Sequence, residues 1–173
     1  SAGLALMRAS RAQKKTAPYT DLGLDAFYGA LPFTLTGAQS RAIRDIAADL
    51  GRGAPMNRLV QGDVGSGKTM VAAASVFLAA RNGFQSALMA PTEILAEQHF
   101  HSLSKIFEPL GITVALLTGS MTPKQKRLVR ERIASADTAK GQTIASALYT
   151  LGTAMGNSLG GTVIDALSLG AML

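Results

Sequence analysis

The sequence predicts an α/β domain with a parallel sheet, followed by a helical, glycine-rich tail. Between residues 57 and 135, apolar segments of strand length alternate with segments of helical periodicity, which is typical of a parallel sheet with right-handed crossovers. A glycine-rich turn joins the first of these strands to the helix after it. Charged residues then become rare, since residues 141 to 164 contain none. The chain therefore divides into an α/β part and a tail of different composition.

Helices are expected before the alternating region. Residues 3 to 14 favour a helix that ends before Pro18, and residues 22 to 30 favour a second one. The second helix should stop at Leu31-Pro32, because the residue before a proline disfavours helical dihedral angles. Residues 38 to 50 place apolar side chains at helical spacing, and Gly51 ends that pattern.

The alternating region supplies three strands and three helices. We expect a buried strand over residues 57–61 and further strands over 85–90 and 112–117, with helices over 68–81, over 94–110 and from 122 to about 135. The start of the last helix is well marked. Thr122 can cap it, Pro123 suits the first helical position, and Gln125 completes a capping box.

Composition narrows the class of protein. The chain has 173 residues, of which 47% are hydrophobic, and this is enough for one domain or for one domain with an appendage. It contains no cysteine and only two histidines, so we expect no zinc site and no disulfide framework. The net charge of +6 permits an anionic partner such as nucleic acid, although charge alone does not establish one. No secretory signal pattern is visible, which favours a cytoplasmic protein.

The turn between the first strand and its helix has the sequence pattern of a phosphate-binding loop. It matches G-x-x-x-x-G-K-[ST] through Gly62, Asp63, Val64, Gly65, Ser66, Gly67, Lys68 and Thr69. Glycines let backbone N–H groups converge on phosphate oxygens, and the following helix directs its N-terminal dipole at the same anion. We expect Lys68 to contact the β and γ phosphates and Thr69 to bind Mg²⁺. The pattern predicts binding of a nucleoside triphosphate, and the alternative is a plain strand-to-helix turn.

Four segments around this loop carry a family resemblance, and they are Leu31 to Gln39, Arg58 to Thr69, Ala87 to His99 and Leu116 to Ser120. Together they resemble the start of the first motor domain of the RecG family of bacterial ATP-dependent DNA helicases, over about residues 1 to 136. Transcription-repair coupling factors resemble them less, at Gln61 and residues 90 to 93. The resemblance implies a helical connector over residues 1–30, an incomplete RecA-like P-loop NTPase domain over 31–136, ATP and Mg²⁺ as cofactors, and remodelling of branched DNA in recombination and repair.

The resemblance also assigns roles to single residues outside the loop. Gln39 would hydrogen-bond the edge of adenine, the alternative being an ordinary glutamine at a helix start. Pro91, Thr92 and Glu93 would lie in a loop that touches the DNA backbone, although Thr92 could also cap the following helix. The basic residues from Lys124 to Arg132 are interpreted as a solvated helix face, with a share in DNA binding left open.

Residues after Ser135 depart from the helicase pattern. Hydrolysis needs an Asp-Glu pair at the end of a further apolar strand, and the sequence contains none there. Asp165 ends an apolar run, but Ala166 stands where the glutamate would be required. We therefore expect this chain to bind ATP without turning it over.

The tail over residues 137–173 resembles something else. Residues 141 to 161 resemble a late transmembrane helix of a major facilitator superfamily transporter, with Gly152, Gly156 and Gly160 on one helix face. The uncharged segment from 141 to 164 is long enough to cross a bilayer, the alternative being a weakly apolar helix pair broken at Gly160. The chain is thus interpreted as a chimera, whether a gene fusion, an engineered one or an assembly error. The competing function is a membrane-associated fragment with a non-functional P-loop segment.

Overall fold

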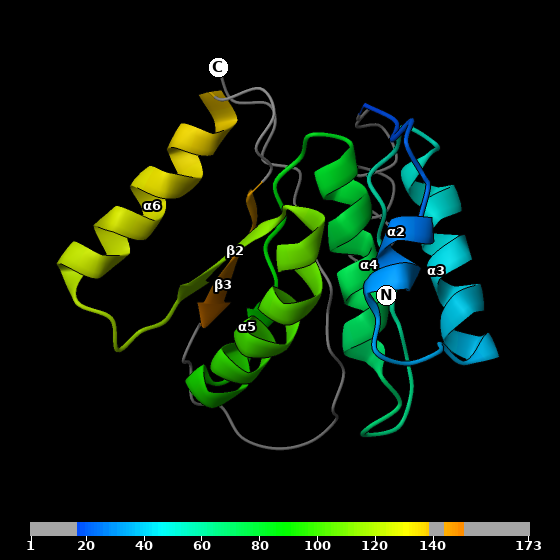
Figure 1. Cartoon of the computed structure of the whole chain (residues 1–173), viewed down its shortest axis with the longest axis horizontal. Coiled ribbons are helices and arrows are strands. Elements are labelled where there is room, and N and C mark those ends of the chain that lie inside the picture. The colour runs from blue at the N-terminus through cyan, green and yellow to red at the C-terminus, as the bar shows by residue number, and fades with distance from the viewer. Residues whose placement is uncertain (1–16, 139–143, 151–173) are drawn as a thin grey trace, which may run out of the picture.

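The computed structural model describes residues 17–138 and 144–150. In chain order its elements are α2 (Asp25–Ala30), α3 (Gly37–Leu50), α4 (Lys68–Arg81), β1 (Met89–Ala90), α5 (Glu93–Phe107), the 3₁₀ helix η1 (Glu108–Leu110), β2 (Thr113–Leu117), α6 (Pro123–Thr138) and β3 (Ile144–Thr150). Figure 1 shows α4 between the sheet and the α2–α3 pair, with α6 beyond β2 on the other side.

The three strands form one parallel sheet in the order β1-β3-β2. β3 is the central strand, and a register shift interrupts its pairing with β2 between Val114 and Ala115. Since all strands are parallel, the loops that follow β1 and β2 leave the sheet at the same edge. The described strands are thus all parallel, as the predicted α/β class requires.

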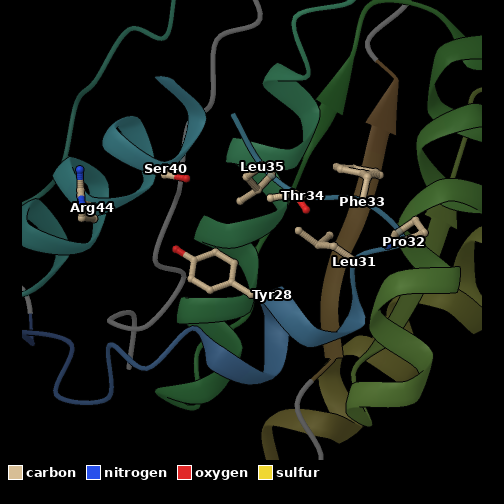
Figure 2. Close-up of a pocket in the computed structure, with 8 residues that line it drawn as sticks. All are labelled: Tyr28, Leu31, Pro32, Phe33, Thr34, Leu35, Ser40 and Arg44. Atoms are coloured by element: carbon tan, nitrogen blue, oxygen red, sulfur yellow. The ribbon is translucent and has the colours of Figure 1, made fainter. Parts of the chain in front are cut away.

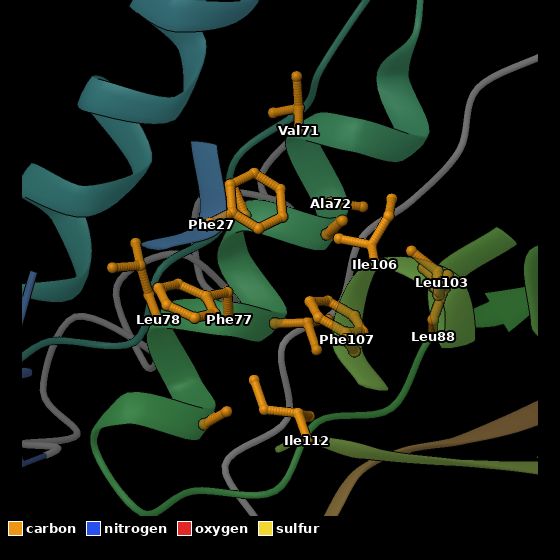
Figure 3. Packing of buried hydrophobic residues seen from close by; sticks show 14 of the residues in the cluster. Phe27, Val71, Ala72, Phe77, Leu78, Leu88, Leu103, Ile106, Phe107 and Ile112 are labelled. Carbon is orange, nitrogen blue, oxygen red and sulfur yellow. The ribbon is translucent and has the colours of Figure 1, made fainter. Parts of the chain in front are cut away.

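The core lies where α4 and α5 pack together against the sheet (Figure 3). Every residue of α4 from Val71 to Ala80 is buried, so this helix is enclosed on all sides. Three fully or nearly fully buried rings join the layers, with ring centres 5.6 Å apart for Phe27 and Phe77 and 6.5 Å apart for Phe27 and Phe107. This packing holds the start of α4, and hence the loop before it, in place.

The chain before α2 is fastened to the far end of α4. Asn82 accepts hydrogen bonds from the amides of Thr20 (2.8 Å) and Asp21 (3.0 Å) and donates one to the Asp21 carbonyl (2.7 Å). The Arg81 guanidinium pairs with the Asp21 carboxylate, and the Tyr19 ring stacks on Phe84 with ring centres 5.0 Å apart. Residues 19–21 are thus part of the packed structure.

Most predicted elements are confirmed within a few residues of their ends, and α2 to α6 all lie where helices were expected. The strand expected over 85–90 is confirmed only at Met89–Ala90. The predicted capping box of α6 is present, because the Thr122 amide donates to Oε1 of Gln125 (2.8 Å) and the Gln125 amide to Oγ1 of Thr122 (3.3 Å). The helix expected over 3–14 lies outside the described residues.

The buried strand predicted over residues 57–61 is wrong. The segment has no strand pairing in the described structure, and Leu59 is 67% exposed. Arg58 instead ties the segment to α3, donating to the Asp49 carboxylate through Nε at 2.8 Å. None of the three described strands pairs with these residues, so their backbone groups enter no ladder there.

The tail over residues 137–173 was expected to be helical, and this prediction is wrong for residues 144–150. Residues 144–150 form β3, which pairs with both β1 and β2. The physical reason is tertiary: β1 and β2 each present unpaired backbone groups to the gap between them, and a strand there satisfies both. The rest of the proposed membrane segment, 141–143 and 151–164, lies outside the described residues. Within the described ranges, no helix is both long enough and apolar enough to span a bilayer.

Candidate functional site

The loop Gly62–Thr69 adopts a conformation that depends on its glycines. Gly65 and Gly67 have φ angles of +82° and +78°, a region that residues with a side chain rarely adopt. At Gly62 a Cβ would lie 2.7 Å from Oγ of Ser66, because the loop closes on itself there. The loop returns through a hydrogen bond from the Ser66 amide to the Asp63 carbonyl (3.1 Å). These features form a cradle that added Cβ atoms would fill.

Lys68 places its charge against this cradle. Its Nζ donates to the carbonyls of Gly62 (2.6 Å) and Asp63 (2.7 Å), so the ammonium group sits at the loop instead of extending into solvent. Lys68 is also the first residue of α4, and Thr69 follows it in the same first turn. The loop therefore combines a fixed positive charge with the free N–H groups of a helix start, which together suit a phosphate chain and its magnesium ion.

Gln39 links the start of α3 to the phosphate loop. Its side-chain Oε1 accepts from the backbone amide of Thr36 (2.8 Å), and its backbone amide donates to the Thr36 hydroxyl (3.2 Å). These two bonds form a capping box. Its Nε2 donates to the Ser66 carbonyl across the loop (2.9 Å). An amide group has a second lone pair and a second N–H, so Gln39 can hydrogen-bond a base edge while keeping both contacts.

A hollow of 680 Å³ lies beside the first turns of α3 (Figure 2). Its wall is formed by Tyr28 of α2, by residues 31–35, and by Ser40 and Arg44 of α3. Apolar side chains and a proline supply most of this wall, while Ser40 and Arg44 add polar groups. Such a surface is suited to a flat, partly apolar group such as a nucleobase.

The loops after β1 and β2 meet at the edge of the sheet. Thr92 caps α5 by accepting from the Leu95 amide (3.3 Å), and Oε1 of Glu93 accepts from the Ser120 amide (2.8 Å). The ammonium group of Lys126 donates to the Gly119 carbonyl (2.7 Å). Hydrogen bonds from the Ser120 hydroxyl and amide hold the pKa of the Glu93 carboxyl below its usual range. The predicted DNA loop is therefore joined to residues 118–120.

The basic face of α6 remains largely turned to solvent. Lys124, Arg127, Arg130 and Arg132 are exposed, and Arg127 forms an ion pair with Glu131 at 3.5 Å. Lys124, Arg127 and Arg130 follow one another at a spacing of three residues and so share one face of α6, whereas Arg132 lies away from it.

The glycine-rich cradle before a buried helix, in a domain with a parallel sheet, defines a nucleotide-binding P-loop domain. The family of DEAD/DEAH box helicases matches residues 36–137, and the chain belongs to this family.

Named relatives make the assignment more specific. The chain is 54% identical over 103 residues to the ATP-dependent DNA helicase RecG of Aquifex aeolicus, covering 60% of this chain and 13% of that protein. It is 53% identical over 111 residues to RecG of Bacillus subtilis, covering 64% and 16%. The RecG-like character of this region is thus established, while the chain spans only 13% and 16% of the lengths of these two relatives.

Solved structures agree. A structure of RecG bound to a three-way DNA junction matches with a TM-score of 0.72 and 37% identity, covering 84% of this chain and 20% of that one. The helicase MrfA bound to DNA matches with a TM-score of 0.52 at 21% identity, covering 77% and 18%, and this likeness concerns the fold alone. The fold is therefore RecA-like, as in these helicase motors.

The structure brings the predicted site residues into two groups. Gln39 joins Gly62–Thr69, whereas Pro91, Thr92 and Glu93 lie at the carboxyl edge of the sheet with Gly119 and Ser120. Sequence reasoning missed the bond from Gln39 to the loop and the bond from Glu93 to Ser120. A long polar side chain in the first turn of a helix was the available signal in both cases.

Proposed function

We propose that residues 31–136 form the ATP-binding part of a RecG-like DNA helicase motor. The observation that carries this proposal is the cradle of Gly62–Thr69, with the Lys68 ammonium group fixed against two of its carbonyls. Backbone N–H groups and Lys68 would hold the phosphates, and Thr69 would hold Mg²⁺. The bound metal would neutralise charge on the phosphate oxygens.

The base would lie against the hollow beside α3. Gln39 keeps one N–H and one lone pair free of the contacts that it makes to Thr36 and Ser66. This donor and acceptor pair suits the edge of adenine, and the apolar wall around residues 31–35 supports its ring. The same glutamine would then contact the base and the phosphate loop at once, through its bond to the Ser66 carbonyl.

DNA is the proposed second partner. The loop Pro91–Glu93 and the loop 118–120 meet at one edge of the sheet, and the RecG structure that resembles this chain is bound to a three-way DNA junction. We place the DNA backbone at this edge, and branched DNA in recombination and repair is the substrate implied by the relatives. The sequence after Ser135 holds no Asp-Glu pair, so the chain alone should bind ATP with negligible turnover.

Lys68→Ala tests the nucleotide site. We expect its affinity for a fluorescent ATP analogue to fall by roughly 10- to 150-fold, which corresponds to the about 1.5–3 kcal/mol of a charge-assisted contact. Circular dichroism should show an unchanged fold, because the Lys68 side chain is not part of the buried core. Lys105→Ala, an exposed lysine of α5, is the matched control and should bind as the parent does.

Equal affinity of the parent and Lys68→Ala would reject the phosphate-loop assignment. Phosphate release measured in the same samples, with and without junction DNA, examines turnover. If junction DNA stimulates phosphate release and Lys68→Ala abolishes it, the prediction that this chain binds ATP without hydrolysing it is wrong.

A further inference from the structure

Glu93 bridges two loops that the sheet topology separates. β1 and β2 are not neighbours, because β3 lies between them. Glu93 follows β1 and Ser120 follows β2, and they are 27 positions apart in the chain. The contact between the Glu93 carboxylate and the Ser120 amide, at 2.8 Å, therefore passes over the end of the central strand.

Several further contacts hold the second loop in the same place. The Thr118 and Ser120 hydroxyls are hydrogen-bonded at 3.1 Å, and Lys126 holds the Gly119 carbonyl at 2.7 Å. A Cβ on Gly119 would lie 2.7 Å from Oε1 of Glu93, so the carboxylate fits against a residue without a side chain. This arrangement is a built contact between Glu93 and the Gly119–Ser120 loop.

The chemistry of Glu93 argues against a direct role on DNA. A carboxylate beside a phosphate repels it, and an ionised carboxylate has no hydrogen to donate to phosphate oxygens. The hydrogen bonds from Ser120 and Gly119 and the charge of Lys126 together favour the ionised form, with the Ser120 hydroxyl foremost. Glu93 is therefore in its charged state at neutral pH, and its acceptor capacity is directed at the protein.

We propose that Glu93 is a positioning residue, which fixes the Gly119–Ser120 loop beside Pro91 and Thr92 so that both loops form one edge for the DNA backbone. This inference rests on the proposed DNA function and changes the part that Glu93 takes in it. Pro91, Thr92 and Ser120 contact the backbone, whereas Glu93 acts through Ser120. Loss of the bridge leaves the second loop free to move away from the edge.

DNA affinity separates positioning from contact. Glu93→Ala should weaken binding of the 173-residue chain to a fluorescein-labelled three-way junction by about tenfold, the loss expected for one well-placed hydrogen bond. Glu93→Gln keeps an acceptor oxygen for the Ser120 amide and should restore most of the affinity. If Glu93 faced phosphate, both variants would bind as tightly as the parent or more tightly, and that result would overturn the proposal. Glu97→Ala, an exposed glutamate on α5, is the control.

Gly119→Ala supplies a second measurement. As a single change, this substitution adds a Cβ that collides with the Glu93 carboxylate. Gly119→Ala should therefore weaken DNA binding by a factor similar to that of Glu93→Ala. In the Glu93→Ala background that clash is absent, and Gly119→Ala should add little. Additive effects of the two changes would contradict a contact between these residues.

The hydrogen bond between Glu93 and the Ser120 amide can be tested without DNA. In ¹H–¹⁵N spectra, the Ser120 amide should shift with pH as Glu93 titrates, and this shift should vanish in Glu93→Ala but persist in Glu97→Ala. A Ser120 amide that ignores Glu93→Ala would show that the bridge does not exist. If the bridge is seen but the parent binds no DNA, the DNA part of the proposed function fails, and with it the role of Glu93 in positioning a DNA-binding edge.

Discussion

Replacing Gly67 by alanine should destabilise the phosphate loop through two separable effects. The φ angle of +78° places this residue in the left-handed region, where a side chain costs about 1–2 kcal/mol. A Cβ would also collide with Nε2 of Gln39, which donates to the Ser66 carbonyl. Losing that hydrogen bond costs about 0.5–1.5 kcal/mol more. We therefore expect the free energy of unfolding to fall by roughly 1.5–3.5 kcal/mol in Gly67→Ala.

Gly65 provides a matched control on the same loop. Its φ angle is +82°, but a Cβ there would meet nothing within 4 Å. Gly65→Ala should therefore show the conformational cost alone, about 1–2 kcal/mol. The difference between the two variants measures the contact with Gln39.

A double-mutant cycle completes the experiment. In a Gln39→Ala background the colliding amide is gone, and Gly67→Ala should then cost no more than Gly65→Ala. Urea unfolding followed by far-UV circular dichroism supplies all of these free energies. Equal losses for Gly67→Ala and Gly65→Ala in the parent would refute the argument, because they would show that Gln39 does not lie against the loop.

Two further predictions concern the core and the response to pH. Phe27→Ala should lower the free energy of unfolding by about 3–5 kcal/mol, because the buried Phe27 ring packs on Phe77 and Phe107. Phe33→Ala, which removes a half-exposed ring, should lower it far less. Urea unfolding measures both changes, and similar losses would contradict the assigned core. Burial lowers the pKa of His99, so the unfolded chain binds more protons below roughly pH 6.5 and the free energy of unfolding should fall as the pH drops through that value. His99→Gln should remove this dependence of the free energy of unfolding on pH, whereas His101→Gln, which replaces an exposed ring, should keep it. A pH dependence unchanged by His99→Gln would refute its attribution to His99.

Local signals in the sequence were sufficient for most helices and for the phosphate loop. The capping box at Thr122 and Gln125 and the stop at Gly51 act within a few residues, so the sequence states them directly. The loop Gly62–Thr69 is similar, because its conformation depends on glycines at set positions within it. These features need no knowledge of the rest of the chain.

Strand pairing was less predictable because it depends on neighbours distant in sequence. Residues 57–61 have the apolar composition of a strand, yet no described strand pairs with them and Leu59 remains exposed. Residues 144–150 have a composition that also suits a helix, yet they occupy the gap between β1 and β2. In both cases, the available partner decides whether the segment is a strand, and composition does not contain that information.

Gln39 and Glu93 share a placement that explains why their second contacts were missed. Each lies in the first turn of a helix, where the side-chain bonds tilt toward the helix N-terminus. A long polar side chain at that position extends past the helix start and reaches whichever loop lies in front of it. For Gln39 this is the phosphate loop, and for Glu93 it is the loop after β2. The residue type and the helix start are visible in the sequence, but the loop in front of the helix is set by the sheet order. A glutamine or glutamate in the first turn of a helix in a parallel α/β domain is therefore a candidate bridge between loops, and its partner is found only once the strands are placed.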